Sequence, residues 1–127
     1  MDTPGRRELV ERYIAAYNAF DVEGMLATLS ADVVFQNFSS GQLTAQSEGK
    51  DEFRRLAEQG KALFSEREQT IVSLREEGDS LVVDIAYRGR LAQDIPGGPV
   101  AGTRLELAGQ SEFSFGDGCI TRLVDRS

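Results

Sequence analysis

Proton transfer in this chain can use only carboxyl groups, tyrosine hydroxyls or water. The 127 residues include no histidine and a single cysteine, Cys119. Without histidine there is no imidazole acid or base, no Ser-His-Asp or Cys-His nucleophile, and no His-ligated zinc or haem. One cysteine excludes an intrachain disulfide, a Cys-rich zinc site and an iron–sulfur cluster. We therefore expect no metal and no cofactor, and an acid or base must be Asp, Glu or Tyr.

Asp125 is the strongest candidate for such an acid or base. It ends an alternating segment that begins at Cys119, and the alternation places it on one face of a strand with Thr121 and Leu123. In an apolar pocket, desolvation would raise the pKa of this carboxyl group, which suits acid–base work near neutral pH. The alternative is a structural carboxylate whose pKa is lowered by an arginine partner. The arginines considered for that pairing are Arg88, Arg122 and Arg126.

Amphipathic helices are expected in the first half of the chain. Thr3 is predicted as an N-cap and Pro4 as the first helical residue of a helix that runs to about Asn18. Asp21 is predicted to cap a second, shorter helix, and a third helix is expected over residues 50–64. Between the second and third helices, we expect a short strand over residues 32–37 and a loop over 38–49.

Alternating apolar and polar residues dominate after residue 65. The expected strands are residues 66–75, 81–91, 103–115 and 119–125, joined at 77–79, at a Pro/Gly loop over 94–102, and at 116–118. Helices followed by an antiparallel meander predict an α+β fold. We expect a single domain over residues 1–127, in which three N-terminal helices pack on a strongly curved, mainly antiparallel sheet that forms a cone-shaped pocket.

The charge and hydropathy exclude several kinds of partner. There are 14 Lys and Arg against 21 Asp and Glu, a net charge of −7, and no segregated basic patch, so nucleic-acid binding is not expected. No apolar run is long enough for a signal peptide or a membrane span, so we expect no membrane association and a cytoplasmic location. Asp84 and Glu106 are expected on the face of the sheet that points away from the apolar side.

Three segments resemble the nuclear transport factor 2-like superfamily, in the same order and spacing. They are RYIAAYNAFDVEGMLATLSADVVFQN, EGKDEFRRL and SEFSFGDGCITRLVD. This superfamily of α+β cones includes SnoaL-type polyketide cyclases, ketosteroid isomerases and limonene epoxide hydrolases. The resemblance covers nearly the whole chain. It implies that any active site lies inside the cone, and that the outer face of the sheet forms a homodimer.

The resemblance assigns roles residue by residue. Ketosteroid isomerases use a helical Tyr, an Asp base on the first strand and a protonated Asp on a later strand. The matching positions here are Tyr13, Asn37 and Ser111, so two of the three acids are missing. Limonene epoxide hydrolases position water with a Tyr-Gln-Asn run and activate it with an Asp on the last strand. Phe35-Gln36-Asn37 and Asp125 match these elements, whereas Ala86-Tyr87-Arg88 stands where those enzymes carry Arg-x-Asp.

The candidate catalytic residues are therefore Asp125, Asn37 and Tyr13. Asn37 could instead cap the end of a strand, and Tyr13 could be a core residue. The candidate ligand-binding residues are Phe35, Phe53, Leu107, Ser111, Phe113 and Tyr17.

Three functions remain open at this point. The first is an isomerase, cyclase or epoxide-hydrolase-like enzyme that acts on a small, mostly apolar, oxygenated substrate. The second is a non-catalytic binding protein for a hydrophobic metabolite. The third is a structural homodimer whose cone is filled by its own side chains, which a cavity well below about 300 Å³ would favour.

Overall fold

The structure is a computed structural model that describes residues 2–127. Helix α1 (Thr3–Asn18) begins with Asp2 as its N-cap, whose side chain accepts a hydrogen bond from the Gly5 amide. The prediction of Thr3 as the cap is wrong: Thr3 is the first helical residue, because the Asp2 carboxylate already satisfies a free amide of the first turn. Helix α2 (Val22–Leu26) has Asp21 as its N-cap, as predicted.

The first two strands form a hairpin that the sequence did not predict. Strand β1 (Leu29–Ser39) is longer than the expected strand, and β2 (Gln42–Glu48) lies within the expected loop, so that prediction is wrong. Ser40 and Gly41 both have positive φ, which allows a two-residue turn between the strands. Because β2 is an edge strand with mostly exposed side chains, its sequence lacks the alternation on which the prediction depended.

The remaining elements follow the prediction to within a few residues. They are α3 (Gly49–Leu63), β3 (Phe64–Glu77), β4 (Ser80–Leu91), β5 (Arg104–Gly116) and β6 (Cys119–Arg126). One detail on β6 is wrong. A bulge leaves Thr121 without a partner on β5, so Ile120 and Leu123 point to the same side and Thr121 does not share their face by simple alternation.

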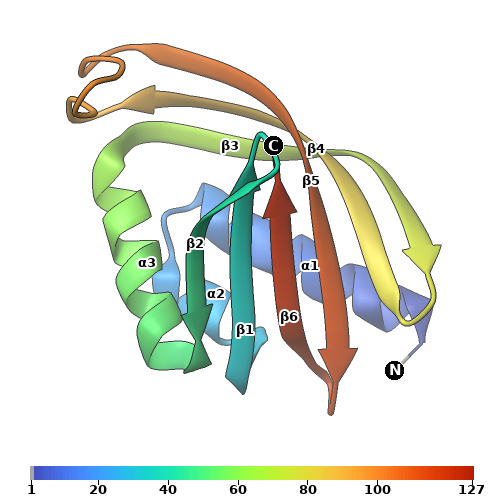
Figure 1. The fold of residues 1–127 in the computed structure, drawn as a ribbon. Coiled ribbons are helices and arrows are strands. Elements are labelled where there is room, and N and C mark those ends of the chain that lie inside the picture. The colour runs from blue at the N-terminus through green and yellow to red at the C-terminus, as the bar shows by residue number, and fades with distance from the viewer. Residues whose placement is uncertain (1) are drawn as a thin grey trace.

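The strands form a six-stranded mixed sheet in the order β2-β1-β6-β5-β4-β3, not a four-stranded meander. All neighbouring pairs are antiparallel except β1 and β6, which are parallel. This parallel pair joins the N-terminal hairpin to the C-terminal strand, and it places Asn37 beside Asp125. In Figure 1 the long strands β3, β4 and β5 bend over α1, and the edge strand β2 lies next to α3, with β1 and β6 between β2 and β5, so the sheet is strongly curved.

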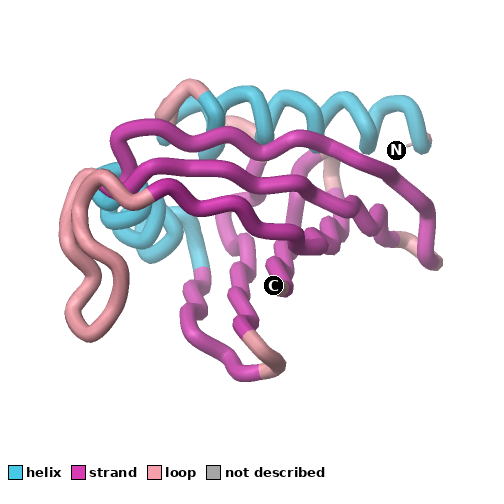
Figure 2. Tube along the Cα trace, turned by 90° about the horizontal axis from the view of Figure 1, so that it is seen from above, coloured by secondary structure: helices cyan, strands magenta, loops and turns pink. Residues whose placement is uncertain are grey.

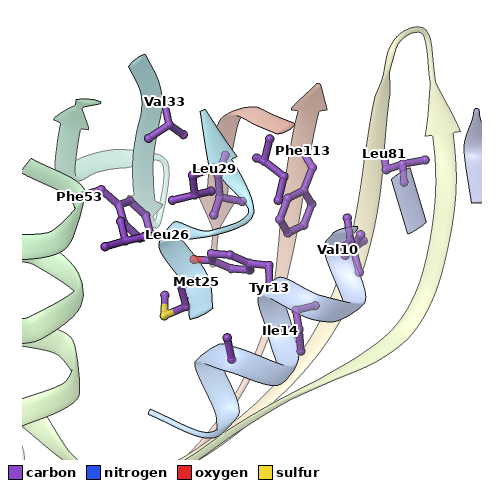
Figure 3. Packing of buried hydrophobic residues seen from close by; sticks show 14 of the residues in the cluster. Val10, Tyr13, Ile14, Met25, Leu26, Leu29, Val33, Phe53, Leu81 and Phe113 are labelled. Atoms are coloured by element: carbon purple, nitrogen blue, oxygen red, sulfur yellow. The ribbon is translucent and has the colours of Figure 1, made fainter. Parts of the chain in front are cut away.

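The helices cover one face of this curved sheet. Figure 2 shows α1 running along the long strands, with the other helical segments gathered at one end. Buried side chains from α1, α2, α3 and the inward strand faces form one cluster, part of which Figure 3 shows. It includes Val10, Ile14, Leu29, Leu81 and Phe113. The fold is therefore the predicted α+β cone. In the described part of the chain no helix is long and apolar enough to cross a membrane.

Candidate functional site

Asp125 lies on β6 between two polar neighbours on the inner face of the sheet. Asn37 on β1 and Ser111 on β5 are its register partners on either side. The Ser111 hydroxyl donates a 2.6 Å hydrogen bond to Oδ1 of Asp125. The neighbouring strands therefore supply the carboxyl group with one fixed donor and one amide side chain.

No arginine in the part of the chain that the structure describes forms an ion pair with Asp125. The three arginines considered as partners bind elsewhere. Arg88 pairs with Glu68 at 2.7 Å, Arg126 pairs with Glu112 at 3.1 Å, and Arg122 donates to Gln36 at 2.9 Å. The alternative interpretation of Asp125 as an arginine-bound structural residue therefore finds no support in this geometry.

Burial raises the pKa of Asp125 to about 6, while the hydrogen bond from Ser111 acts in the opposite direction and favours the charged form. Desolvation is the larger of the two effects. The residue nevertheless keeps some accessible surface, because it lines two partly open cavities rather than packing fully against protein. A carboxyl group of this kind exchanges its proton close to neutral pH.

Two adjoining cavities meet at Asp125. The first, which we call the helical lobe, has a volume of about 180 Å³ and is lined from α1, α2, α3 and the sheet. The second, the sheet lobe, has a volume of about 170 Å³ and is lined mostly by β4, β5 and β6. Both lobes share Tyr17, Gln69 and Asp125. Each lobe alone is smaller than the ~300 Å³ typical of a ligand pocket, and the shared residues place the carboxyl group at their junction.

Tyr13 lies in the wall of the helical lobe. Its ring contacts Phe53 and Phe113, with centroid distances of 6.5 and 5.8 Å. Figure 3 shows its hydroxyl group directed away from Phe113, toward the side of the cluster where Met25 lies. This hydroxyl forms no hydrogen bond to any residue that the structure describes, and burial raises the pKa of Tyr13 well above its ordinary value. Tyr13 is thus a neutral donor without a protein acceptor.

Asn37 lines the sheet lobe, but its side chain is partly engaged. Its Nδ2 group donates a 2.8 Å hydrogen bond to the hydroxyl of Thr44, which itself donates to the Asn37 carbonyl. These bonds lie at the bulge in the β1–β2 hairpin. Asn37 lies within β1 and not at its end, so it does not cap the strand; its side chain bonds to β2, and the residue also lines the sheet lobe.

The candidate ligand-binding residues divide between the lobes. Phe35 and Phe53 line the helical lobe, with their rings edge to face at 5.6 Å. Leu107 and Ser111 line the sheet lobe, and Leu107 is 53% exposed. Phe113 lines neither lobe: it is 1% exposed and packs in the core behind Tyr13.

Tyr87 lines the sheet lobe, and Arg67 and Gln69, which were not among the candidates from the sequence, also line the lobes. The Tyr17 hydroxyl donates to that of Tyr87 at 3.3 Å. Arg67 and Gln69 share the inward face of β3 because their register partners are Gly89 and Tyr87. Arg67 and Gln69 are two residues apart in an alternating segment, and this spacing is the sequence signal that could have predicted both side chains on the inner face of the sheet. Among the described residues no cluster of carboxylate or thiol side chains could hold a metal ion.

Comparison with known proteins agrees with this architecture. A structure of a proposed polyketide cyclase from Xanthomonas campestris superposes with a TM-score of 0.85 at 22% identity, covering 98% of this chain and 90% of that one. TsrD from Streptomyces laurentii gives a TM-score of 0.81 at 24% identity, over 98% and 89% of the two chains. A proposed polyketide cyclase from Silicibacter gives 0.75 at 25% identity, over 95% and 87%.

No curated protein matches the sequence. The sequence profile of the SnoaL-like domain, however, matches residues 10–123, which is most of the chain and includes all three segments that carried the resemblance, apart from the last residues of the third. The α+β cone, the inward-facing polar residues and this match lead to one conclusion. The chain belongs to the SnoaL-like family, within the nuclear transport factor 2-like superfamily.

Proposed function

We propose that this protein binds a small, mostly apolar, oxygenated molecule in the two lobes, and that Asp125 transfers a proton to or from it. The reaction would be a cofactor-independent isomerisation, cyclisation or epoxide opening. The observation that carries the proposal is the position of Asp125 at the junction of both lobes, without an arginine partner among the described residues. Structural relatives described as proposed polyketide cyclases support the same class of chemistry.

The neighbouring groups suit this role. With a pKa of about 6, Asp125 is mostly ionised at neutral pH and can accept a proton from a bound ligand. Ser111 holds one carboxylate oxygen, which leaves the other for the ligand. The unpartnered hydroxyl of Tyr13 can donate to a ligand oxygen on which negative charge develops, and the amide of Asn37 can orient the ligand or a water molecule.

Deuterium exchange tests this proposal even while the natural substrate is unidentified. A general base that removes a proton next to a carbonyl group exchanges that proton with D₂O, which NMR detects. We would screen small cyclic ketones and enones as probes. We expect exchange to be catalysed by the wild-type protein, with a rate that rises as the pH passes about 6, and to be lost in Asp125→Asn.

Asp117→Asn is the matched control. Asp117 is an exposed residue in the β5–β6 turn with a φ of 51°, a conformation that Asn tolerates well. The substitution makes the same chemical change far from the cone, so exchange should continue. Equal exchange in wild-type protein and Asp125→Asn would contradict a catalytic role for Asp125.

A binding protein without chemistry is the second candidate. The observation in its favour is the replacement of the two isomerase carboxylates by Asn37 and Ser111, both of which line the sheet lobe. If this function is correct, the probes bind without exchange and Asp125→Asn leaves their affinity nearly unchanged. The third possibility, a structural homodimer whose cone is filled by its own side chains, stays open, because each lobe by itself is well below the ~300 Å³ of a typical ligand pocket.

We also propose a homodimer through the outer face of the sheet. This face carries Asp84 and Glu106 together with Ala86 and Ala108, as the register of β4 and β5 places them. A face that mixes charged and small apolar side chains is better suited to an interface between two copies than a fully polar face would be. Sedimentation at micromolar concentration should give twice the mass of one chain, and a monomer would contradict the proposal.

A further inference from the structure

Arg67 is a buried cation without an anionic partner. Its side chain projects from the inward face of β3, and the residue is 7% exposed. Within residues 2–127 no carboxylate forms an ion pair with it, and its Nη2 atom is buried without any hydrogen bond. Buried charges are normally paired, because removing a charge from water costs several kcal/mol in proteins even after relaxation. The unused Nη2 group therefore requires an explanation.

The contacts around Arg67 fix its position. Its Nε group donates a 3.1 Å hydrogen bond to the Tyr17 carbonyl in the last turn of α1. The guanidinium carbon lies 3.8 Å from the ring centroid of Tyr17 and 4.5 Å from that of Phe20. The Asn18 side chain also links the end of α1 to this part of β3: it accepts a hydrogen bond from the Gln69 backbone amide and donates one to the Gln69 carbonyl. The guanidinium is thus held before any ligand binds.

These contacts stabilise the charge only in part. The end of a helix carries about half a negative charge, and aromatic faces attract cations. Neither contact supplies a hydrogen-bond acceptor to Nη2. The other terminal nitrogen, Nη1, lies on the side of α3, where a Cβ atom built on Gly60 would be 3.8 Å away. Because Gly60 and Arg67 both line the helical lobe, the Arg67 side chain contributes to the wall of that cavity on the side of Nη1.

We propose that the helical lobe binds a ligand with an anionic oxygen, most simply a carboxylate, and that Arg67 is the residue that selects for it. This inference rests on the proposed small-molecule pocket and names the class of ligand. The planar guanidinium can donate two parallel hydrogen bonds to a carboxylate on the ligand. A neutral amide group on the ligand cannot accept the same pair of hydrogen bonds and does not balance the charge. The rest of the ligand would contact Phe35 and Phe53 and extend toward Asp125, which lines the same lobe.

The size of the lobe sets the size of the probe. An apolar cavity of ~150 Å³ holds one benzene ring, so the helical lobe of about 180 Å³ suits a single ring with a small substituent. Benzoate and benzamide are nearly identical in shape and differ in charge. We would measure their affinities by NMR titration at about pH 5.5, where benzoate is ionised and Asp125 is largely protonated and repels it least.

The substitution that removes the charge is Arg67→Gln, and its matched control is Arg88→Gln. Arg88 lies on the neighbouring strand β4, with a side chain that is 73% exposed and paired with Glu68. We expect the wild-type protein to bind benzoate at least about tenfold more tightly than benzamide, equal to ~1.4 kcal/mol. Arg67→Gln should abolish this preference with little effect on benzamide, and Arg88→Gln should retain it.

Each other outcome overturns the inference in a distinguishable way. Equal wild-type affinity for benzoate and benzamide contradicts anion selection but leaves the pocket intact. If Arg67→Gln loses affinity for benzoate and benzamide equally, Arg67 only supports the fold. No binding of either probe at millimolar concentration contradicts both this inference and the proposed pocket. If Arg67→Gln does not fold, Arg67→Lys keeps the positive charge without the planar fork and should show a reduced but measurable preference for benzoate.

Discussion

Ser111 and Asp125 face each other across β5 and β6, and the serine hydroxyl lies 2.6 Å from the carboxylate oxygen to which it donates. This distance is within the range of charge-assisted O–H···O⁻ bonds. It is the only hydrogen bond that the carboxyl group of Asp125 receives from the described residues. The serine therefore limits how far burial raises the pKa of the carboxyl group, and it fixes the orientation of one carboxylate oxygen.

Replacing Ser111 by Ala should raise the pKa of Asp125 further. The lost hydrogen bond favours the charged form, and hydrogen bonds to charged groups contribute ~1.5–3 kcal/mol, so we expect an increase of roughly one to two units. Carboxyl ¹³C NMR titration of both proteins would measure the change. An unchanged or lower pKa in Ser111→Ala would show that another group, such as water, takes over the role of the hydroxyl.

The raised pKa of Asp125 predicts that this residue destabilises the protein at neutral pH. Folding favours the protonated form, so the penalty is absent below the unfolded pKa of 3.8, grows as the pH rises, and is complete above about 6. The shift corresponds to a penalty of up to ~3 kcal/mol. Asp125→Asn should therefore have a larger free energy of unfolding than wild type at pH ~7, and this difference should shrink toward pH ~4. Denaturant unfolding measures both values. A difference that does not depend on pH would contradict the assignment.

The hydroxyl of Tyr13 should contribute to ligand affinity and not to the free energy of unfolding. Because it has no acceptor among the described residues, Tyr13→Phe should change the free energy of unfolding by less than ~1 kcal/mol. The affinity for a carbonyl-containing ligand should fall roughly tenfold, which corresponds to the loss of one hydrogen bond. Parallel denaturation and ligand titration distinguish the two effects. A large loss of stability with unchanged ligand affinity would mean that Tyr13 is only a core residue.

Substitutions of Phe113 and Leu107 should have opposite effects: the first should reduce stability, and the second should reduce ligand affinity. Phe113→Ala removes a side chain that is 1% exposed and should lower the free energy of unfolding by ~3–5 kcal/mol. Leu107→Ala removes a side chain that is 53% exposed and lines the sheet lobe, so it should change stability little and weaken ligands that extend into that lobe. Thermal unfolding and ligand titration of both variants provide the comparison. Equal destabilisation would place Leu107 in the core.

Local sequence patterns predicted the parts of the fold that depend on local periodicity. The helices and the strands β3 to β6 have clear apolar spacing, and alternation placed Leu123 and Asp125 on one face of β6. The hairpin partner β2 was missed because an exposed edge strand needs no apolar face. The parallel pairing of β1 with β6 joins residues that are far apart in the sequence, and no local pattern indicates it.

The site was predicted in part for the same reason. Asp125 and Ser111 were both named from the sequence, but their hydrogen bond depends on the register between two strands. Arg67 was missed because a charged residue on an alternating strand is normally assigned to the solvent side. Its burial results from the end of α1, which supplies a carbonyl acceptor and two aromatic rings across the cone.

The most direct test of a proton-transferring Asp125 is its own titration in the folded wild-type protein. Its carboxyl ¹³C resonance can be assigned by its disappearance in Asp125→Asn. A carboxyl group that lines a cavity without a cationic partner should titrate at about 6. A midpoint near 4 or below would mean that the group is solvated or paired with a cation, and the acid–base proposal would then be wrong.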